Sequence, residues 1–268
     1  MFTLGFLFFL TSCGKNEAVE EDYDWEEPVV NDVIPGEMVF IPAGEFIMGT
    51  DNKTPDDVQA FPERKMKLDA FWMDKYEVTN EEFWKFSRDT EYLGEGVLKG
   101  HDWRTYYRMG VEDNVPVVFI TWKDADTYCK ANGKRLPLEA EWEYAARGPN
   151  GNKYPWGNEW EDGHANTSET GRRAPADVGT NDDVSHFGAH DMLGNVQEWT
   201  ESWYETYPGG VADPNSGKKF RVVRGLSPNY RGQAASLWSR FAQPPTALFN
   251  YGFRCARNAT PEEIASNQ

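Results

Sequence analysis

The sequence is poor in the side chains that bind transition metals, with only three Cys and four His among 268 residues. Thiolates and imidazoles are the usual protein ligands of copper, zinc and iron. No cysteine lies between Cys129 and Cys255. His186 and His190 have a spacing that would place both on one face of a helix, but Gly188 lies between them and no third ligand is evident. We therefore expect no transition-metal site.

Basic residues are missing from one long stretch. Between Asn16 and Asn52 there is no Lys or Arg, while residues 16–32 carry eight acidic side chains. Such a segment buries too little apolar surface to fold, so residues 13–35 are expected to form a flexible acidic tether. The net charge is −17; without Lys15 and those eight carboxylates, 26 basic residues face 36 acidic ones, which leaves −10. This charge argues against nucleic acid and against an anionic membrane surface as partners.

The apolar run at the start of the chain is too short to span a bilayer. Residues 1–12 read MFTLGFLFFLTS and are followed by Cys13. This length suits a secretory signal peptide, and LTSC at residues 10–13 resembles a bacterial lipobox. The alternative is a buried apolar N-terminus with a chance cysteine. We expect lipidation at Cys13, with the lipid as the only membrane contact, and a location in the bacterial cell envelope.

The two remaining cysteines form a natural pair. If Cys13 carries lipid, Cys129 and Cys255 are left together in an exported protein, where disulfides persist. A bridge between them would close a loop of more than a hundred residues and contribute about 4–5 kcal/mol in the chain-entropy model. The alternative is two separate buried thiols. We favour the disulfide.

Glycine and proline are spread throughout, with 24 Gly and 16 Pro, and this composition predicts a loop-rich fold. Gly36–Thr50 alternates apolar and polar residues around Pro42-Ala43-Gly44, which predicts a hairpin. Residues 65–78 continue in the style of a strand. Pro116–Trp122 is expected to be a buried strand.

Capping signals mark three helices. Thr79–Glu82 is a capping-box signature. Asp124 is expected to cap a second helix, and Leu136-Pro137 to begin a third that stops at Gly148. Residues 149–190 lack periodicity, so we expect bound cations and buried tryptophans to hold them in place.

The stretch GAHDMLGNVQEWTESW, Gly188–Trp203, contains the strongest candidate for a cation site. Asp191 and Glu198 supply carboxylates, and the carbonyls of Gly194 and Val196 lie between them. Calcium takes about six to eight oxygen ligands from side chains and backbone together. The alternative is an ordinary turn followed by a strand with an exposed Glu, because EF-hand spacing is absent.

Several motifs occur in an order that resembles a known family. They are MVFIPAGEFIMG, YEVTNEEF, the run from PVVFITW to EYAARG, YPWGN, MLGNVQEW, RVVRG and GFRCA. Together they resemble the formylglycine-generating enzyme family, also called the sulfatase-modifying-factor domain. The resemblance covers residues 36–257 and leaves 258–268 as a C-terminal tail. It implies a single compact α+β domain, related to C-type lectins, with little regular secondary structure and stabilised by calcium.

The resemblance also assigns roles to individual positions. Asp191, Gly194, Val196 and Glu198 match the better-defined calcium loop of the family, with Asp191 in place of an Asn. Cys129 and Cys255 match the positions of a family disulfide. Asn166 resembles the start of the other calcium site, but the loop after it is shorter here, and that site is left open.

The copper chemistry of the family does not carry over. Active members hold Cu(I) on two cysteines a few residues beyond a Gly-Gly-Ser, whereas the segment here reads RGLSPNYRGQAASLWSRFAQ. Ser227 matches the family Ser, Leu226 replaces the second Gly, and soft thiolates are absent. We therefore assign no catalytic residue and expect no copper. A binding cleft is expected from Ser227, Asn229, Tyr230, Arg231, Trp238 and Arg240, with simple packing as the alternative.

These features predict an exported lipoprotein whose calcium-stabilised domain has a non-catalytic binding or scaffolding role. Its partner is expected to be an envelope or secreted protein or peptide, and the chain to be a monomer outside a complex. Two alternatives stay open: a sulfatase-maturation oxidoreductase or other oxidase of this family, and a lipoprotein of a gliding or secretion machinery. Neighbouring sulfatase genes would favour the first alternative and secretion genes the second.

Overall fold

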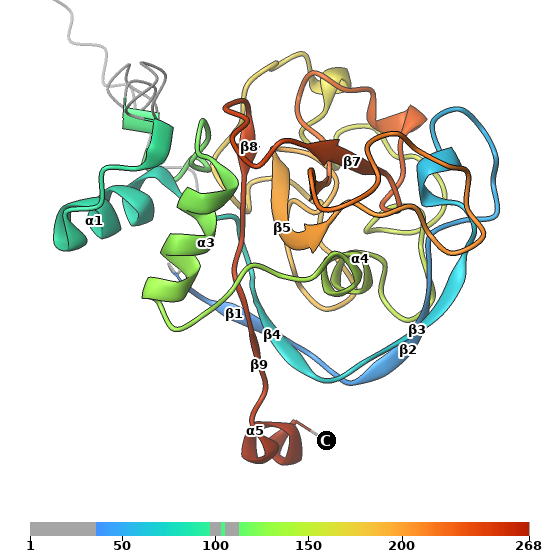
Figure 1. Cartoon of the computed structure of the whole chain (residues 1–268), viewed down its shortest axis with the longest axis horizontal. Coiled ribbons are helices and arrows are strands. Elements are labelled where there is room, and N and C mark those ends of the chain that lie inside the picture. Colours follow the sequence, from blue (N-terminus) through green and yellow to red (C-terminus); the bar gives the residue numbers. More distant parts are fainter. Residues whose placement is uncertain (1–35, 97–102, 105–112, 268) are drawn as a thin grey trace, which may run out of the picture. The chain divides into compact units, whose positions relative to one another are not determined.

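The computed structural model describes residues 36–96, 103, 104 and 113–267. The predicted signal peptide and the tether, including Cys13, lie outside these residues. The fold is α+β with little regular secondary structure, as predicted (Figure 1). Its strands are β1 (Met38–Ile41), β2 (Gly44–Met48), β3 (Arg64–Leu68), β4 (Phe71–Asp74), β5 (Gln197–Trp203), β6 (Arg221–Arg224), β7 (Arg240–Gln243), β8 (Tyr251–Gly252) and β9 (Ala256–Asn258). The α-helices are α1 (Asn80–Thr90), α3 (Trp122–Ala131), α4 (Glu139–Arg147) and α5 (Pro261–Ser266).

The first four strands form one long antiparallel ribbon rather than the hairpin predicted at Pro42. β1 pairs with β4 and β2 pairs with β3, and both pairings keep the same register. The ribbon curves beneath α4 in Figure 1. Pro42 has no N–H to donate, so it interrupts the strand ladder without reversing the chain. The reversal lies between Met48 and Arg64, and the prediction of a turn at Pro42 was wrong.

The helix caps follow local sequence closely. Thr79 caps α1 and forms the predicted capping box with Glu82. For α3 the N-cap is Thr121 and not the predicted Asp124. Asp124 is the third residue of the helix, and its carboxylate accepts the Thr121 N–H at 2.8 Å. α4 begins at Glu139, later than predicted, because the backbone of Leu138 is still extended, with φ −64° and ψ 152°.

A four-stranded sheet, in the order β7-β6-β5-β8, lies at the centre of the domain. Trp142 of α4 and Trp199 of β5 are fully buried beside it. Residues 116–121 are buried as predicted, except for the half-buried Phe119, but they form no strand. Their backbone donors have unrelated partners: the Val117 N–H reaches the Val78 carbonyl and the Phe119 N–H reaches that of Phe249. A ladder needs successive bonds to one neighbour, so the strand prediction was wrong.

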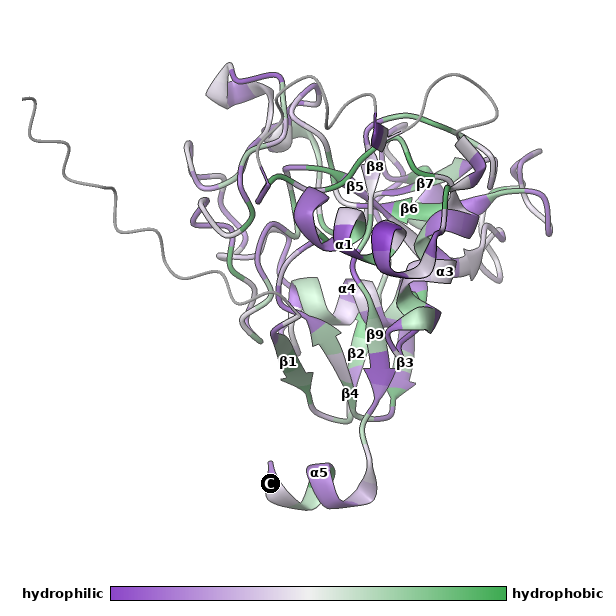
Figure 2. Ribbon diagram, turned by 90° about the vertical axis from the view of Figure 1, so that its left-hand side faces the viewer, coloured by the Kyte–Doolittle hydropathy of each residue, from purple (hydrophilic) through white to green (hydrophobic). Residues whose placement is uncertain are grey.

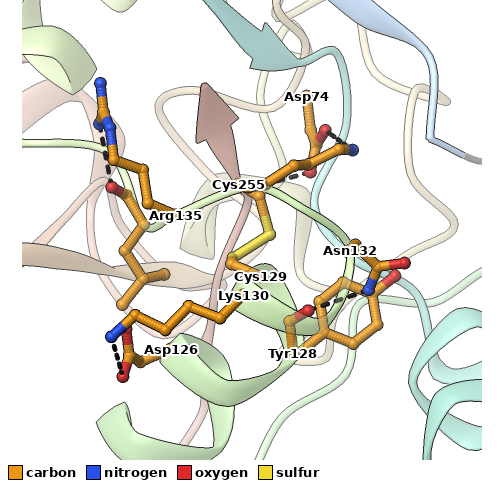
Figure 3. The surroundings of a disulfide bond; sticks show 10 residues. Asp74, Asp126, Tyr128, Cys129, Lys130, Asn132, Arg135 and Cys255 are labelled. Carbon is orange, nitrogen blue, oxygen red and sulfur yellow. Dashed lines mark hydrogen bonds and ion pairs between the residues drawn. A yellow bond between two sulfur atoms is a disulfide. The ribbon is translucent and has the colours of Figure 1, made fainter. Parts of the chain in front are cut away.

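The predicted disulfide joins Cys129 of α3 to Cys255, with a Cα–Cα distance of 5.6 Å (Figure 3). The Asp74 carboxylate beside it accepts the Cys255 N–H at 2.9 Å and the Lys134 ammonium at 2.5 Å. The bridge and Asp74 thus tie α3 to the C-terminal segment that enters β9. Beyond β9 the chain continues into α5, which lies at the far end of that strand in Figure 2.

Residues 149–190 contain a single 3-10 turn, η3 (Ser168–Thr170), as their only helical element. An aromatic cluster holds the beginning of this stretch: Tyr154 stacks on Trp156 at 5.5 Å, and Trp160 contacts both rings. Buried tryptophans were expected there, but Trp156 and Trp160 are only partly buried, and Tyr154 is the buried member of the cluster. In the part of the chain that the structure describes, no helix is long and apolar enough to cross a bilayer.

Candidate functional site

The two carboxylates of the predicted calcium loop are both buried and hydrogen-bonded. Asp191 accepts the Gly179 N–H at 2.7 Å and the Asn181 side-chain amide at 2.9 Å. Glu198, at the start of β5, accepts two hydrogen bonds from Arg254, each 2.8 Å long, and one from the Trp142 indole at 2.9 Å. Each carboxylate oxygen has more than one lone pair, so these bonds leave capacity for a further ligand.

Two further buried acids, Glu77 and Asp183, lie beside this pair and were not predicted. The Asn195 side-chain amide donates to Glu77 Oε1 at 3.1 Å, and the Leu193 N–H donates to Asp183 Oδ2 at 2.8 Å. Their other oxygens, Glu77 Oε2 and Asp183 Oδ1, are buried without a hydrogen-bond partner among the described residues. Nothing in the local sequence distinguishes either acid from a surface residue.

Glu77, Asp183, Asp191 and Glu198, here called the acid cluster, contain more negative charge than the protein compensates. Four carboxylates face the single guanidinium of Arg254, which leaves a formal charge of −3 if all are ionised. Burial and the charge of Asp191 raise the pKa of Asp183 to about 8. Burial likewise raises the pKa of Glu77, again with a contribution from Asp191. Buried carboxylates in such excess are normally neutralised by a bound cation or by protons.

The acid cluster offers hard oxygen donors of the kind that calcium prefers. Within the described ranges, no three His, Cys, Asp or Glu side chains form a metal-binding group by themselves. A cation here would therefore take the carboxylates of Asp191 and Glu198 and complete its shell with backbone carbonyls of Gly194 and Val196 and with water, all hard oxygen donors. Gly194 is required by packing, because a Cβ at this position would meet the Asn166 carbonyl at 2.7 Å. Bound calcium would supply charge neutralisation to this buried region.

Asn166 and the two histidines occupy structural positions. The Asn166 side-chain amide donates to the Ala174 carbonyl at 3.0 Å and to Asn195 Oδ1 at 3.1 Å. His190 packs on Tyr76 with ring centroids 5.0 Å apart, and His186 packs on Phe187 at 4.9 Å. The histidines lie in a turn region and not on one helix.

A groove of about 320 Å³ lies at the start of β7 and includes part of the predicted cleft. One wall comes from residues 55–59, and the other from the loop after β6. Three predicted residues line it, namely Tyr230, Arg231 and Arg240, together with Pro55, Asp56, Gln59, Leu226, Ala234, Ala235, Ser239 and Phe241. The contribution of residues 55–59 was not predicted, because they lie far from β7 in sequence.

Arg240 lines the groove but is almost fully buried, with 3% of its surface exposed. Its Nε donates to Glu139 Oε1 at 2.6 Å and its Nη2 to Oε2 at 2.9 Å. Its Nη1 donates to the carbonyls of Glu205 at 2.8 Å and Gln59 at 3.3 Å. Burial alone would raise the pKa of Glu139, but the guanidinium groups of Arg240 and Arg224 outweigh it and hold that pKa below its ordinary value. Arg240 therefore positions the wall of the groove.

The other predicted cleft residues lie around the groove without lining it. Trp238 is largely buried, and its indole N–H donates to Asp57 Oδ1 at 2.7 Å, which fastens the 55–59 wall a second time. Ser227 is buried and its hydroxyl has no hydrogen-bond partner among the residues that the structure covers. Asn229 is exposed beside Tyr230.

The chemistry available in the groove suits binding. Tyr230 is 42% exposed and contacts the ring of Phe241, with centroids 6.1 Å apart. Arg231 is exposed and makes no ion pair with any described residue. The lining residues contain no thiol, and the sulfurs of Cys129 and Cys255 are bonded to each other. Exposed aromatic and arginine side chains are typical anchors of binding sites.

Comparisons with known proteins agree with the fold. Residues 27–259 match the sulfatase-modifying factor enzyme 1-like domain. A formylglycine-generating enzyme from Bos taurus is 32% identical over 291 residues, covering 85% of this chain and 76% of that protein. An inactive C-alpha-formylglycine-generating enzyme 2 from Mus musculus is 30% identical, covering 83% of this chain and 86% of that protein.

Among solved structures, that of PvdO from Pseudomonas aeruginosa superposes with a TM-score of 0.68 at 25% identity, covering 85% of this chain and all of that one. The family thus contains proteins named as active and as inactive enzymes. With a matching domain over most of its length and relatives above 30% identity, this chain belongs to the formylglycine-generating enzyme, or sulfatase-modifying factor, family.

Proposed function

We propose that this protein is a non-catalytic member of its family that binds a protein or peptide partner in the bacterial cell envelope. The observation that carries the proposal is the absence of cysteine from residues 130–254, which include the segment RGLSPNYRGQAASLWSRFAQ around Ser227. Soft thiolates are the ligands that stabilise Cu(I), and Tyr, Ala or Ser cannot replace them. The two cysteines of the domain are joined to each other and cannot serve instead.

One relative is named as an inactive enzyme, which supports this proposal. The mouse protein named as inactive is similar over most of the domain, so the fold is compatible with a role other than formylglycine formation. In this chain the groove presents an exposed aromatic and an arginine that has no ion-pair partner among the described residues, and its lining contains no thiol. A groove without reactive groups is suited to binding.

The cell-envelope location rests on the sequence around Cys13 and on the cysteine pair. A lipobox-like LTSC followed by an acidic segment would place the domain at the end of a lipid-anchored tether. A buried disulfide is compatible with an exported protein. Changing Cys13→Ser should release the protein from the membrane fraction; unchanged fractionation would contradict the lipid anchor.

Calcium is proposed as a structural cofactor that neutralises the acid cluster. The excess of buried carboxylate supports it, as do the oxygens of Glu77 and Asp183 that have no hydrogen-bond partner among the described residues. A bound cation would hold the irregular chain around residues 179–198 in one conformation, because Asp191 already binds Gly179 and Asn181. Its role would be stability of the domain and not chemistry.

Binding at the groove can be tested with a peptide selected from a random library on the immobilised domain. Affinity for the free peptide is then measured by calorimetry for the wild type and two variants. Tyr230→Ala removes an exposed aromatic anchor and should weaken binding about tenfold or more. Leu93→Ala, a change at a residue 60% exposed that does not line the groove, is the matched control and should leave affinity unchanged. Failure to select any binder, or equal affinities of all three proteins, would overturn the proposed function.

A further inference from the structure

β7 forms one end of the central sheet. It pairs antiparallel with β6, in a register running from Arg221 opposite Gln243 to Arg224 opposite Arg240. In an antiparallel pair only alternate residues direct their N–H and C=O groups toward the partner, so half of β7 directs them away from β6. Among the described residues, no hydrogen bond from elsewhere in the chain reaches the backbone of β7. This edge of the sheet therefore has no strand partner among the described residues, although η1 (Val58–Ala60) contacts β7.

The groove lies along the same strand. Arg240 and Phe241 of β7 line it, as does Ser239 immediately before them. Natural sheets usually protect a free edge with charged or proline residues on the strand, yet three of the four residues of β7, Phe-Ala-Gln, carry neither. The prolines follow directly, at positions 244 and 245, and limit the usable edge to a short segment.

The opposite wall is held at a fixed position relative to β7. The Arg240 guanidinium reaches the Gln59 carbonyl, and the Trp238 indole reaches the Asp57 carboxylate. Both side chains are themselves buried, so residues 55–59 are fastened from two points of the same segment. A groove with fixed walls loses little conformational entropy when a ligand enters.

The side chains of the groove indicate the character of its ligand. Leu226, Ala234 and Ala235 give it an apolar part that would take a small apolar side chain. Arg231 is exposed at the groove and has no ion-pair partner within the described ranges, although the domain carries a large excess of acidic residues. An unpaired guanidinium at the rim favours a carboxylate on the ligand.

We propose that an extended segment of the partner adds to the free edge of β7 as a fifth strand and places an acidic side chain beside Arg231. This inference rests on the proposed binding function and specifies how the partner is bound. Backbone hydrogen bonds to β7 supply affinity that is independent of sequence, while the apolar part of the groove and Arg231 select the side chains. A helical ligand would leave the edge of β7 unpaired.

The binding mode is tested by methylating the selected peptide at one backbone nitrogen at a time. Strand addition directs every second N–H of the peptide to β7, so N-methylation should weaken binding about fivefold or more at alternate positions and little at those between. Deuterium exchange adds a readout on the protein: amides of β7 should exchange more slowly with peptide bound, whereas those of α1, which does not contact the groove, should be unaffected.

The role of Arg231 is tested with a double-mutant cycle. Replacing the acidic residue of the peptide by its amide should weaken binding to the wild type about tenfold, and the same replacement should have no effect on Arg231→Gln. A peptide that is sensitive to Tyr230→Ala but shows no alternation on N-methylation, or no coupling to Arg231, would overturn this inference and leave the proposed function in place. Loss of the Tyr230 dependence would instead remove the proposed function.

Discussion

Glu198 and Arg254 form a bidentate ion pair in the interior, with Nε–Oε2 and Nη2–Oε1 distances of 2.8 Å. Both side chains are fully buried. Arg254 also donates to the carbonyls of Asp74, Lys75 and His190. The residue predicted to bind calcium is thus joined, through one guanidinium, to β4 and to the C-terminal GFRCA motif.

The ion pair predicts a large cost for removing either partner. Glu198→Gln should lower the free energy of unfolding by about 1.5–3 kcal/mol, because it removes the charged hydrogen bonds to Arg254, while Glu77 stays 3.7 Å from the guanidinium. Urea titration followed by tryptophan fluorescence measures this. Arg257→Met breaks the half-exposed pair with Glu263 and should cost less than about 1 kcal/mol. Equal effects of the two changes would contradict the structural role given to Glu198.

The acid cluster predicts a dependence of stability on calcium. Removal of calcium with EDTA should lower the melting temperature, because the buried carboxylates then repel one another or must take up protons. Added calcium should restore it. In Asp191→Ala the melting temperature should be lower and the same with and without chelator. Identical melting of the wild-type protein under both conditions would show that no such site exists.

The disulfide predicts linkage between two distant peptides. Mass spectrometry of a digest made without reductant should find the Cys129 and Cys255 peptides joined. The bridge spans 126 positions of sequence, and a closed loop of this size contributes about 4–5 kcal/mol in the chain-entropy model. Reduction should therefore lower the free energy of unfolding by a similar amount. Recovery of two alkylated thiols from the native protein would refute the pairing.

The pair formed by Glu139 and Arg240 predicts a loss of stability in acid. The pKa of Glu139 is lower in the folded protein than its ordinary value of 4.5. Its contribution is therefore fully present above pH 4.5 and is lost as the pH falls through the folded-state pKa. Urea titrations of wild type and Glu139→Gln should show a stability difference that narrows in acid. Glu262→Gln, an exposed control, should follow the wild type at every pH, and a difference that stays constant for Glu139→Gln would count against the ion pair.

The parts of the fold that could be predicted depend on neighbouring residues. The capping box of Thr79 and Glu82 and the end of α4 at Gly148 require only local contacts, and both are present. The turn predicted at Pro42 failed because alternation alone does not show which strand is the partner. Family motifs, and not periodicity, identified the overall fold.

The candidate site was less predictable than the helix ends, because its contacts join residues that lie far apart in the sequence. Glu77 of the acid cluster accepts a hydrogen bond from Asn195, which lies 118 positions away. Asp57 meets Trp238 across 181 positions. The burial of Arg240 depends on Glu139, Gln59 and Glu205, which come from three separate segments. No local pattern marks such residues, so the walls of the groove and half of the acid cluster emerge only from the tertiary structure.

The most direct test of the non-catalytic assignment is an assay for formylglycine. A peptide containing a Cys-x-Pro-x-Arg motif is incubated with the purified protein and copper under air, and mass spectrometry measures the loss of mass when the thiol side chain becomes an aldehyde. The formylglycine-generating enzyme of Bos taurus, assayed in parallel, shows that the peptide and conditions support turnover. We expect no conversion by this protein, because its groove contains no thiolate to hold Cu(I). Copper-dependent formation of the aldehyde would contradict the account.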